Sequence, residues 1–241
     1  METPLLSVVK ANKYFGGLAA VRNFSFDVQA GEAVGLMGPN GAGKTTLVNL
    51  IYGVYKPDSG TIKFKGNDIS GLPPHKICHL GIARTYQIPQ PFTTLTALQN
   101  IMVAAIFGRG LQRADAEGEA VKILDALDLS EKTNMLTKDM DEVALKRLEL
   151  ARVLATRPSL LLIDEVAAGL TEAEIPRILE ILRDIRGTGV AIMLIEHVMK
   201  VMTEAVDRII VMDRGEKIGE GKPDEVMKDR KVIEAYLGEP E

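Results

Sequence analysis

The sequence predicts an α/β fold organised around a phosphate-binding loop. Three observations support this: a Gly-rich loop between an apolar run and a helix, further apolar runs typical of buried parallel strands, and helical segments between them. The loop, residues 38–46, fits the pattern of Gly, four residues, Gly, Lys and then Ser or Thr. The apolar run 33–37 precedes it and a helix with Leu47, Leu50 and Ile51 on its apolar face follows. Strand, loop and helix in this order form the supersecondary motif of phosphate loops.

The chemistry of the loop suits the phosphates of a nucleotide. Its glycines let the backbone turn tightly and aim several N–H groups at an anion. Lys44 adds a positive charge, Thr45 offers a hydroxyl to Mg²⁺, and the following helix directs the positive end of its dipole at the same place. A Gly-rich turn without a ligand is the alternative. The predicted nucleotide-binding residues of the loop are Gly38, Pro39, Asn40, Gly41, Ala42, Gly43, Lys44, Thr45 and Thr46.

Composition limits the function classes. The chain has 241 residues, 46% of them hydrophobic, which is enough for a substantial core. Its net charge of -4 does not favour a nucleic-acid partner. The single cysteine, Cys78, allows no intramolecular disulfide and favours a reducing compartment. Residues 1–6 lack the pattern of a signal peptide, and the apolar stretches are shorter than the ~20 residues that span a bilayer, so we expect any membrane contact to occur through a partner.

The first 30 or so residues predict strands of an antiparallel sheet. Apolar and polar residues alternate over 24–28, which is the period of a half-buried strand, and residues 61–64 repeat this pattern after a turn. Phe15 lies beside a glycine turn. Its ring could stack on the base of the nucleotide or belong to the core, and the residues alone favour neither alternative.

A short helix is predicted to begin at Pro73 and to carry three side chains with metal-ligand spacing. His75, Cys78 and His79 stand at positions i, i+3 and i+4, on one helix face. Exposed helix faces collect such residues, and no further group of ligands lies nearby in the sequence. The pattern therefore favours an ordinary exposed face over a metal site.

The centre of the chain predicts a strand, three helices and a second buried strand. The strand covers 82–87, and the helices cover 98–106, 114–127 and 142–155. The apolar run 160–163 ends in Asp164 and Glu165, at the edge of a parallel sheet where ligands bind. In a nucleotidase, Asp164 would hold Mg²⁺ through water and Glu165 would polarise the water that attacks the γ-phosphate. The alternative is a strand that ends in a capped turn.

The remaining segments complete an alternation of helix and strand. A capping box at 171–174 predicts a helix that ends at Gly187 as its C′ residue. The buried strand 190–195 is followed by His197, and a lone histidine in that position is usually structural. Residues 208–218 predict a hairpin, and two short helices close the chain.

Together these motifs resemble the nucleotide-binding domain of ABC transporters, over essentially the whole chain. Segments 15–21, 81–87, 167–170 and 232–238 look like one subfamily, the ATP-binding subunits of branched-chain amino-acid importers, and the chain is more similar to the larger of the two subunits. The resemblance implies a P-loop NTPase of the ABC ATPase type with a mixed sheet core. In a single domain of residues 1–241 we expect an antiparallel β subdomain (about 1–32 and 60–70), a helical subdomain (about 88–157) and a RecA-like core in the remainder.

The resemblance also implies roles for individual residues. Phe15 would stack on the base, Gln87 would be the Q-loop residue that senses Mg²⁺ and the membrane partner, and His197 would be the switch histidine at the γ-phosphate. Residues 169–171 would form the D-loop at a dimer seam. The cofactors would be ATP and Mg²⁺. The implied catalytic residues are Glu165, His197, Lys44 and Gln87, and the implied metal-binding residues are Thr45, Gln87 and Asp164.

One segment departs from the family pattern. The family's signature, Leu-Ser-Gly-Gly-Gln or a close variant, should precede Lys146, but residues 140–144 read Met-Asp-Glu-Val-Ala. Asp141 is a strong candidate for the N-cap of the next helix, and its carboxylate would occupy the N–H groups that otherwise bind the γ-phosphate of a partner's ATP. Glu142 adds a second negative charge, and Val143 restricts close approach of the backbone. The sequence therefore predicts a degenerate signature.

The functional prediction follows from these points. We expect a peripheral subunit at the cytoplasmic face of the cell (inner) membrane that hydrolyses ATP to power uptake of branched-chain or related amino acids. Its partners would be a second ATP-binding subunit, in a heterodimer, two integral-membrane permeases and, indirectly, a solute-binding protein. The alternatives are a nucleotide-binding regulatory module and a non-transport ABC ATPase.

Overall fold

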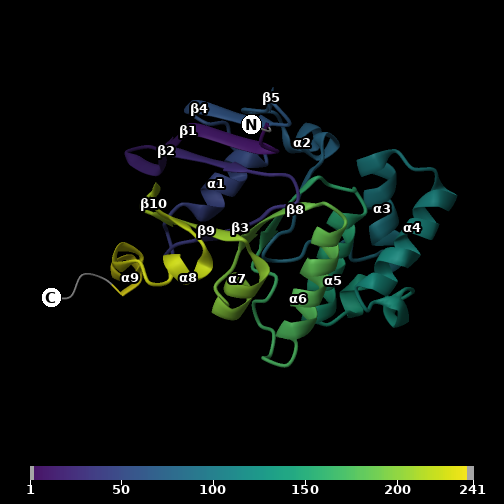
Figure 1. Cartoon of the computed structure of the whole chain (residues 1–241). Helices are drawn as coiled ribbons and strands as arrows, with labels where there is room; N and C mark the ends of the chain where they lie inside the picture. The colour runs from purple at the N-terminus through teal and green to yellow at the C-terminus, as the bar shows by residue number, and fades with distance from the viewer. Residues whose placement is uncertain (1–2, 238–241) are drawn as a thin grey trace.

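The computed structural model describes residues 3–237 and contains two β-sheets with helix α1 (Lys44–Ile51) between them (Figure 1). The first sheet is antiparallel, with strand order β2-β1-β4-β5. The second has the order β10-β9-β3-β8-β7-β6 and is parallel apart from β10. The strands are β1 (Leu6–Phe15), β2 (Leu18–Val28), β3 (Ala33–Met37), β4 (Ser59–Phe64), β5 (Asn67–Asp68), β6 (Ile82–Arg84), β7 (Leu160–Asp164), β8 (Ala191–Ile195), β9 (Arg208–Asp213) and β10 (Glu216–Gly221).

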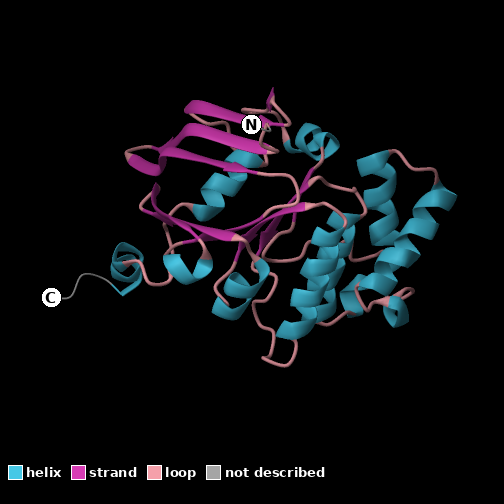
Figure 2. Cartoon of the chain, viewed as in Figure 1, coloured by secondary structure: helices cyan, strands magenta, loops and turns pink. Residues whose placement is uncertain are grey.

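Most helices lie beside the parallel sheet or on the face opposite the antiparallel sheet (Figure 2). Helices α3, α4 and α5 form a group at one end of the molecule, and α7, α8 and α9 lie toward the other end (Figure 1). The remaining helices are α2 (Pro74–Leu80), α3 (Ala97–Arg109), α4 (Arg113–Ala126), α5 (Glu142–Leu154), α6 (Ile175–Gly187), α7 (Met199–Ala205), α8 (Pro223–Val226) and α9 (Arg230–Leu237), with 3₁₀ turns at Ser130–Lys132 and Thr137–Asp139.

The parallel sheet is buried on both faces, as its continuous apolar runs predict. In β7, Leu160 and Leu162 belong to a core shared with the antiparallel sheet and α1, whereas Leu161 and Ile163 pack among helices α3 to α7. Strand β8 divides its side chains between the two cores in the same way. Packing on both faces therefore fixes the strands of this sheet, and the loops of the site follow the ends of these strands.

Several predicted boundaries are wrong; for example, helix α3 continues to Arg109 instead of ending at residue 106. Strand β6 ends at Arg84 instead of continuing to residue 87, because the Thr85 hydroxyl accepts a bond from the Asp164 N–H (3.1 Å) and the chain then leaves the sheet. Helix α6 begins at Ile175, since residues 171–174 form a turn in which the Glu174 N–H donates to the Thr171 carbonyl. Gly187 is the last helical residue rather than C′, and Gly189 takes the left-handed conformation instead (φ +89°).

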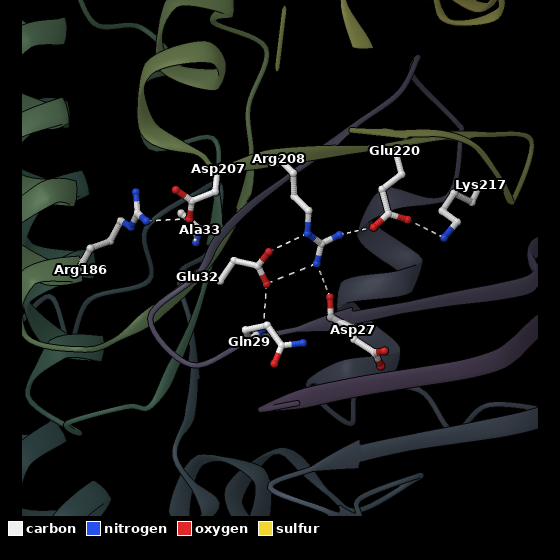
Figure 3. Close-up of polar contacts among 9 residues, drawn as sticks. All are labelled: Asp27, Gln29, Glu32, Ala33, Arg186, Asp207, Arg208, Lys217 and Glu220. Carbon is white, nitrogen blue, oxygen red and sulfur yellow. Dashed lines mark hydrogen bonds and ion pairs between the residues drawn. The ribbon is translucent and has the colours of Figure 1, made fainter. Parts of the chain in front are cut away.

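A polar network fastens the connection between β2 and β3 to strand β9 (Figure 3). Arg208 at the start of β9 pairs with Glu32 (2.7 Å) and Glu220, and it also donates to the Asp27 carbonyl. Beside it, the Asp207 carboxylate accepts from the Ala33 N–H (2.9 Å). These contacts hold the entrance to β3, and therefore the strand that leads into the phosphate loop.

Within residues 3–237, none of the helices combines the length and apolar character that a bilayer crossing requires. Gly238, the end of the last segment that carries the family resemblance, lies outside the described residues.

Candidate functional site

A cavity of about 670 Å³ lies where the phosphate loop meets the carboxyl ends of β7 and β8. The turn between β1 and β2 and the hairpin between β9 and β10 complete its wall. Ligands of open α/β sheets bind at this edge. The lining residues are Phe15, Leu18, Ala19, Ala20, Asn40, Gly41, Ala42, Gly43, Lys44, Thr45, Thr46, Gln87, Asp164, Glu165, Ile195, His197 and Arg214.

The cavity thus brings together most of the residues that the sequence singled out, although they come from five separate segments. Gly38 and Pro39 are the exceptions, because they lie at the base of the loop and outside the lining. Their carbonyl groups accept bonds from the Lys44 ammonium, at 2.6 and 3.0 Å. Burial lowers the pKa of Lys44, against the nearby charges of Glu165 and Asp164.

The loop geometry requires glycine at two positions. Gly43 has φ +107°, and an added Cβ would stand 2.1 Å from the Ala20 carbonyl oxygen. At Gly38 an added Cβ would meet the Met212 carbonyl oxygen at 2.0 Å. Gly43 is also the N-cap of α1, and no side chain caps this helix end. The N-terminus of α1 therefore points its backbone donors at the cavity, which suits an anion such as phosphate.

Glu165, Gln87 and His197 form one polar cluster at the opposite wall. The Gln87 amide donates to one Glu165 oxygen at 2.6 Å, and His197 Nε2 lies 3.1 Å from the other. Glu165 follows β7 in a left-handed conformation, φ +52°, which is uncommon for a residue with a side chain. This conformation turns the carboxylate toward the cavity, with both of its oxygens held.

Asp164 is the most buried carboxylate of the cavity, at 9% exposure. Its side chain lies 3.5 Å from the Arg84 guanidinium, and burial raises the pKa of Asp164 despite that positive neighbour. Thr45 and Gln87 line the same cavity, so carboxylate, hydroxyl and amide oxygens face one space. These hard oxygen donors fit Mg²⁺.

The described residues contain no group of three or more His, Cys, Asp or Glu side chains arranged to hold a metal ion by themselves. This applies to the cavity and to His75 and His79 on α2. A Mg²⁺ ion at Asp164 would therefore depend on oxygens of a bound phosphate, which is how nucleotide sites usually hold it.

Phe15 lies at the surface and not in the core. Its side chain is 43% exposed, lines the cavity and packs edge-on against Tyr55, with ring centroids 5.2 Å apart. Lys13 Nζ stands 5.6 Å from the Phe15 ring centre. The ring is thus partly open to the cavity, where a nucleotide base could reach it.

Sequence reasoning missed three supporting side chains. Arg84 pairs with Asp164, and Arg214 reaches the cavity from the turn of the β9–β10 hairpin. Glu196 is 3% exposed and accepts bonds from the backbone N–H groups of Ala167 (2.6 Å) and His197 (3.0 Å), so it ties the loop after β7 to the loop after β8. A charged residue next to an apolar strand was the available signal for Glu196 and Arg84.

The N-terminus of α5 has the cap that the sequence predicts. The Asp141 carboxylate accepts from the Ala144 N–H at 2.8 Å and pairs with Lys132 at 2.8 Å. The Lys132 bond, together with the Ala144 N–H, lowers the pKa of Asp141. Glu142 lies 3.3 Å from Lys146, whose ammonium also contacts the Ala168 carbonyl. This helix end therefore carries two carboxylates, each paired with a lysine.

Comparisons with known proteins agree with this geometry. The family described as "ABC transporter" matches residues 21–168, and "Branched-chain amino acid ATP-binding cassette transporter" matches residues 216–241. The high-affinity branched-chain amino acid transport ATP-binding protein LivG of Salmonella typhimurium is 37% identical over 99% of this chain and 100% of its own length. BraF of Pseudomonas aeruginosa, with the same description, is equally similar.

The solved structures give the same result for the fold. A nucleotide-free ATP-binding cassette from an ABC transporter superimposes with a TM-score of 0.88 at 30% identity, covering 98% of this chain and 100% of that one. An ATP-binding cassette in its ADP conformation has the same score and identity, with 99% and 100% covered. The predicted fold class and family resemblance are thereby confirmed. The chain belongs to the ABC transporter family, as one of its ATP-binding, ATP-hydrolysing cassettes.

Proposed function

We propose that the cavity binds ATP with Mg²⁺ and that Glu165 and His197 carry the hydrolysis step. The observation that supports this most strongly is the convergence of an uncapped helix N-terminus, one ammonium group and two carboxylates in one cavity. The backbone of residues 40–46 and Lys44 would hold the phosphates, and Phe15 would stack on the base. When bound, Mg²⁺ would neutralise charge on the phosphates, with Asp164, Thr45 and Gln87 around it.

Glu165 has the geometry of a general base. A water that donates to its carboxylate would be aligned for attack on the terminal phosphate, and positioned acid–base groups contribute about 10²–10⁴-fold to rates. Gln87 and His197 each hold one oxygen of Glu165, so they fix its direction. His197 lines the cavity beside Glu165, so its imidazole would be placed to stabilise the phosphate oxygens.

We further propose that the cassette powers uptake of branched-chain or related amino acids. Similarity over the whole chain to two branched-chain amino acid transport ATP-binding proteins supports this substrate class. In this proposal the chain works at the cytoplasmic face of the cell membrane. It would contact two integral-membrane permeases near Gln87 and the helical segment, and a solute-binding protein would deliver the amino acid.

The capped end of α5 supports an asymmetric heterodimer. In an ABC dimer this helix end faces the γ-phosphate held by the other subunit, but here the Asp141 carboxylate already accepts the Ala144 N–H. Two like unit charges 4 Å apart repel by about 4 kcal/mol at an effective dielectric of 20, and the lysines paired with Asp141 and Glu142 would reduce this repulsion. The chain would therefore hydrolyse ATP in its own cavity against an intact signature from a second ATP-binding subunit, and the reciprocal site would be degenerate.

Steady-state ATPase activity tests the proposal. The purified chain is measured alone and then mixed with its candidate partner ATPase, with Glu165→Gln in this chain as the blank. We expect negligible activity alone and strong activation on mixing, which Glu165→Gln reduces by about 10²-fold or more. Activation that persists in Glu165→Gln would contradict the assignment of Glu165. In a regulatory module, Glu165→Gln would change little.

A further inference from the structure

The C-terminal helix α9 contacts the phosphate loop directly. The Tyr236 hydroxyl accepts a hydrogen bond from the backbone N–H of Gly38, at 2.8 Å, across 198 residues of sequence. Tyr236 is half-exposed, and burial of its other half raises the pKa of the phenol. The hydroxyl therefore stays neutral, and its oxygen remains an acceptor for Gly38 at working pH.

Gly38 is the residue at which the loop leaves strand β3, and both of its backbone groups are held. Tyr236 holds the N–H, while the carbonyl accepts from Lys44 Nζ at 2.6 Å. A side chain at position 38 itself is excluded, because an added Cβ would stand 2.0 Å from the Met212 carbonyl oxygen. At Gly38 the loop is thus held by one bond from each side, while further along it the Ala42 carbonyl accepts from the Gly215 N–H at 2.9 Å.

Nucleotide binding would affect the Lys44 and Tyr236 bonds to Gly38 differently. Lys44 must turn toward the phosphates when they arrive, which weakens its hold on the Gly38 carbonyl. The Tyr236 bond lies outside the cavity lining and can persist. In the bound state Tyr236 then remains the anchor at the base of the loop.

Helix α9 is itself seated on the β9–β10 hairpin. Val232 is 2% exposed, and its Cγ2 would lie 3.3 Å from a Cβ at Gly219 in β10. One turn further along, Tyr236 reaches the loop. In contrast, Ile233 on the same helix is 42% exposed.

We propose that Tyr236 is a positioning residue for the phosphate loop, through which helix α9 sets the affinity for nucleotide. The inference rests on the proposed nucleotide site. A loop anchored at Gly38 has fewer conformations to lose when it closes around phosphates, so the anchored loop binds more tightly. Tyr236 touches no reacting atom and acts only through Gly38.

The test is Tyr236→Phe in the full chain, which removes the hydroxyl oxygen and keeps the ring. The dissociation constant for ADP with Mg²⁺ is measured by calorimetry, and the unfolding midpoint is measured without nucleotide. We expect the constant to rise about threefold to tenfold, the range that a net hydrogen bond supports. Ile233→Ala, on the same helix and similarly exposed, should leave it within about twofold.

A purely structural role would give a different result. If Tyr236→Phe lowers the unfolding midpoint but leaves the constant for ADP at the wild-type value, the inference is wrong. Tighter binding would also overturn it, since the bond would then favour the empty loop. A wild-type chain that binds no ADP would instead refute the proposed nucleotide site, and the inference would fall with it.

Discussion

Two helix N-termini, those of α1 and α5, have opposite chemistry. Helix α1 begins after Gly43, has no side-chain cap and faces the cavity with Lys44 at its first position. Helix α5 begins after Asp141, whose carboxylate accepts from Ala144, and its first residue is Glu142. At both ends the first backbone N–H groups have no partner within the helix, and the positive end of the helix dipole lies there. At α1 these N–H groups are open to a ligand anion, whereas at α5 the chain supplies its own anion, the Asp141 carboxylate.

The comparison shows that a helix N-terminus can bind phosphate when no side chain of the chain itself caps its backbone donors. The residues that make α1 receptive are glycines, which place backbone and no carboxylate before the helix. A single aspartate before α5 instead satisfies one of these donors, the Ala144 N–H, at 2.8 Å. The account of an asymmetric dimer therefore depends on the residues at the start of α5, Asp141, Glu142 and Val143, and substitutions there can test it.

The largest expected effect comes from closing the open end. Gly43→Ala forces a side chain into φ +107° and against the Ala20 carbonyl. We expect the free energy of unfolding to fall by about 3 kcal/mol, with a loss of ADP affinity larger than that of Tyr236→Phe. Urea unfolding and calorimetry measure the two quantities.

The matched control is Gly187→Ala in the last turn of α6, where an added methyl meets no heavy atom within 4 Å. This change should be neutral or slightly stabilising, because alanine favours helix over glycine by about 1 kcal/mol. If Gly43→Ala behaved like Gly187→Ala, the loop geometry described above would be incorrect.

A smaller effect comes from opening the closed end. Asp141→Ala removes the cap of α5 and should lower the free energy of unfolding by about 1 kcal/mol. Glu142→Ala is the matched control, because Glu142 is exposed and pairs only with Lys146, and surface pairs contribute about 0.5 kcal/mol or less. Equal losses in the two variants, measured by urea unfolding, would mean that Asp141 does not cap the helix.

The pKa values of the aspartates in the two regions shift in opposite directions. The pKa of Asp141 is lowered by Lys132, whereas burial raises the pKa of Asp164. A raised pKa means that the folded state prefers the proton, so stability falls as pH rises from about 4 through the folded pKa. We expect Asp164→Asn, which keeps an acceptor for Arg84, to be more stable than the wild type at pH 7 by about 0.5 kcal/mol.

That advantage should narrow as pH is lowered toward about 4, where the Asp164 of the wild type becomes protonated. Urea unfolding at several pH values follows the difference. An advantage that stays constant or grows on acidification would show that burial of charge at Asp164 does not limit stability.

The sequence predicts the α/β layers and the open helix end well, because local patterns determine them. The alternation over residues 24–28 and the apolar runs before Lys44 and Asp164 each correspond to a strand. Asp141 was identified as a cap from its position alone, and the structure shows its bond to Ala144. These features depend on neighbours within a few residues.

Features that depend on distant residues could not be predicted in this way. Gln87, Glu165 and His197 were each identified, but their common hydrogen bonding arises from the register of β6, β7 and β8. The boundary errors have both kinds of cause: a local one at the start of α6, where the Thr171 carbonyl accepts the Glu174 N–H, and a distant one at the end of β6, where Thr85 bonds to Asp164. Tyr236 and Gly38 are 198 residues apart in the sequence, so no local periodic pattern predicts their contact.

One measurement tests the central claim most directly: the Glu165-dependent ATPase rate of the chain alone, compared with that of Asp141→Ser with Glu142→Gly. The double variant replaces the two carboxylates by Ser and Gly, the signature's residue types at these two positions, and leaves Val143 unchanged. The account predicts negligible turnover for the wild type alone and a rise of at least about tenfold in the variant, since about 1.4 kcal/mol of relieved repulsion is enough for that factor. A wild-type chain that alone matches the variant, with activity abolished by Glu165→Gln, would contradict the account.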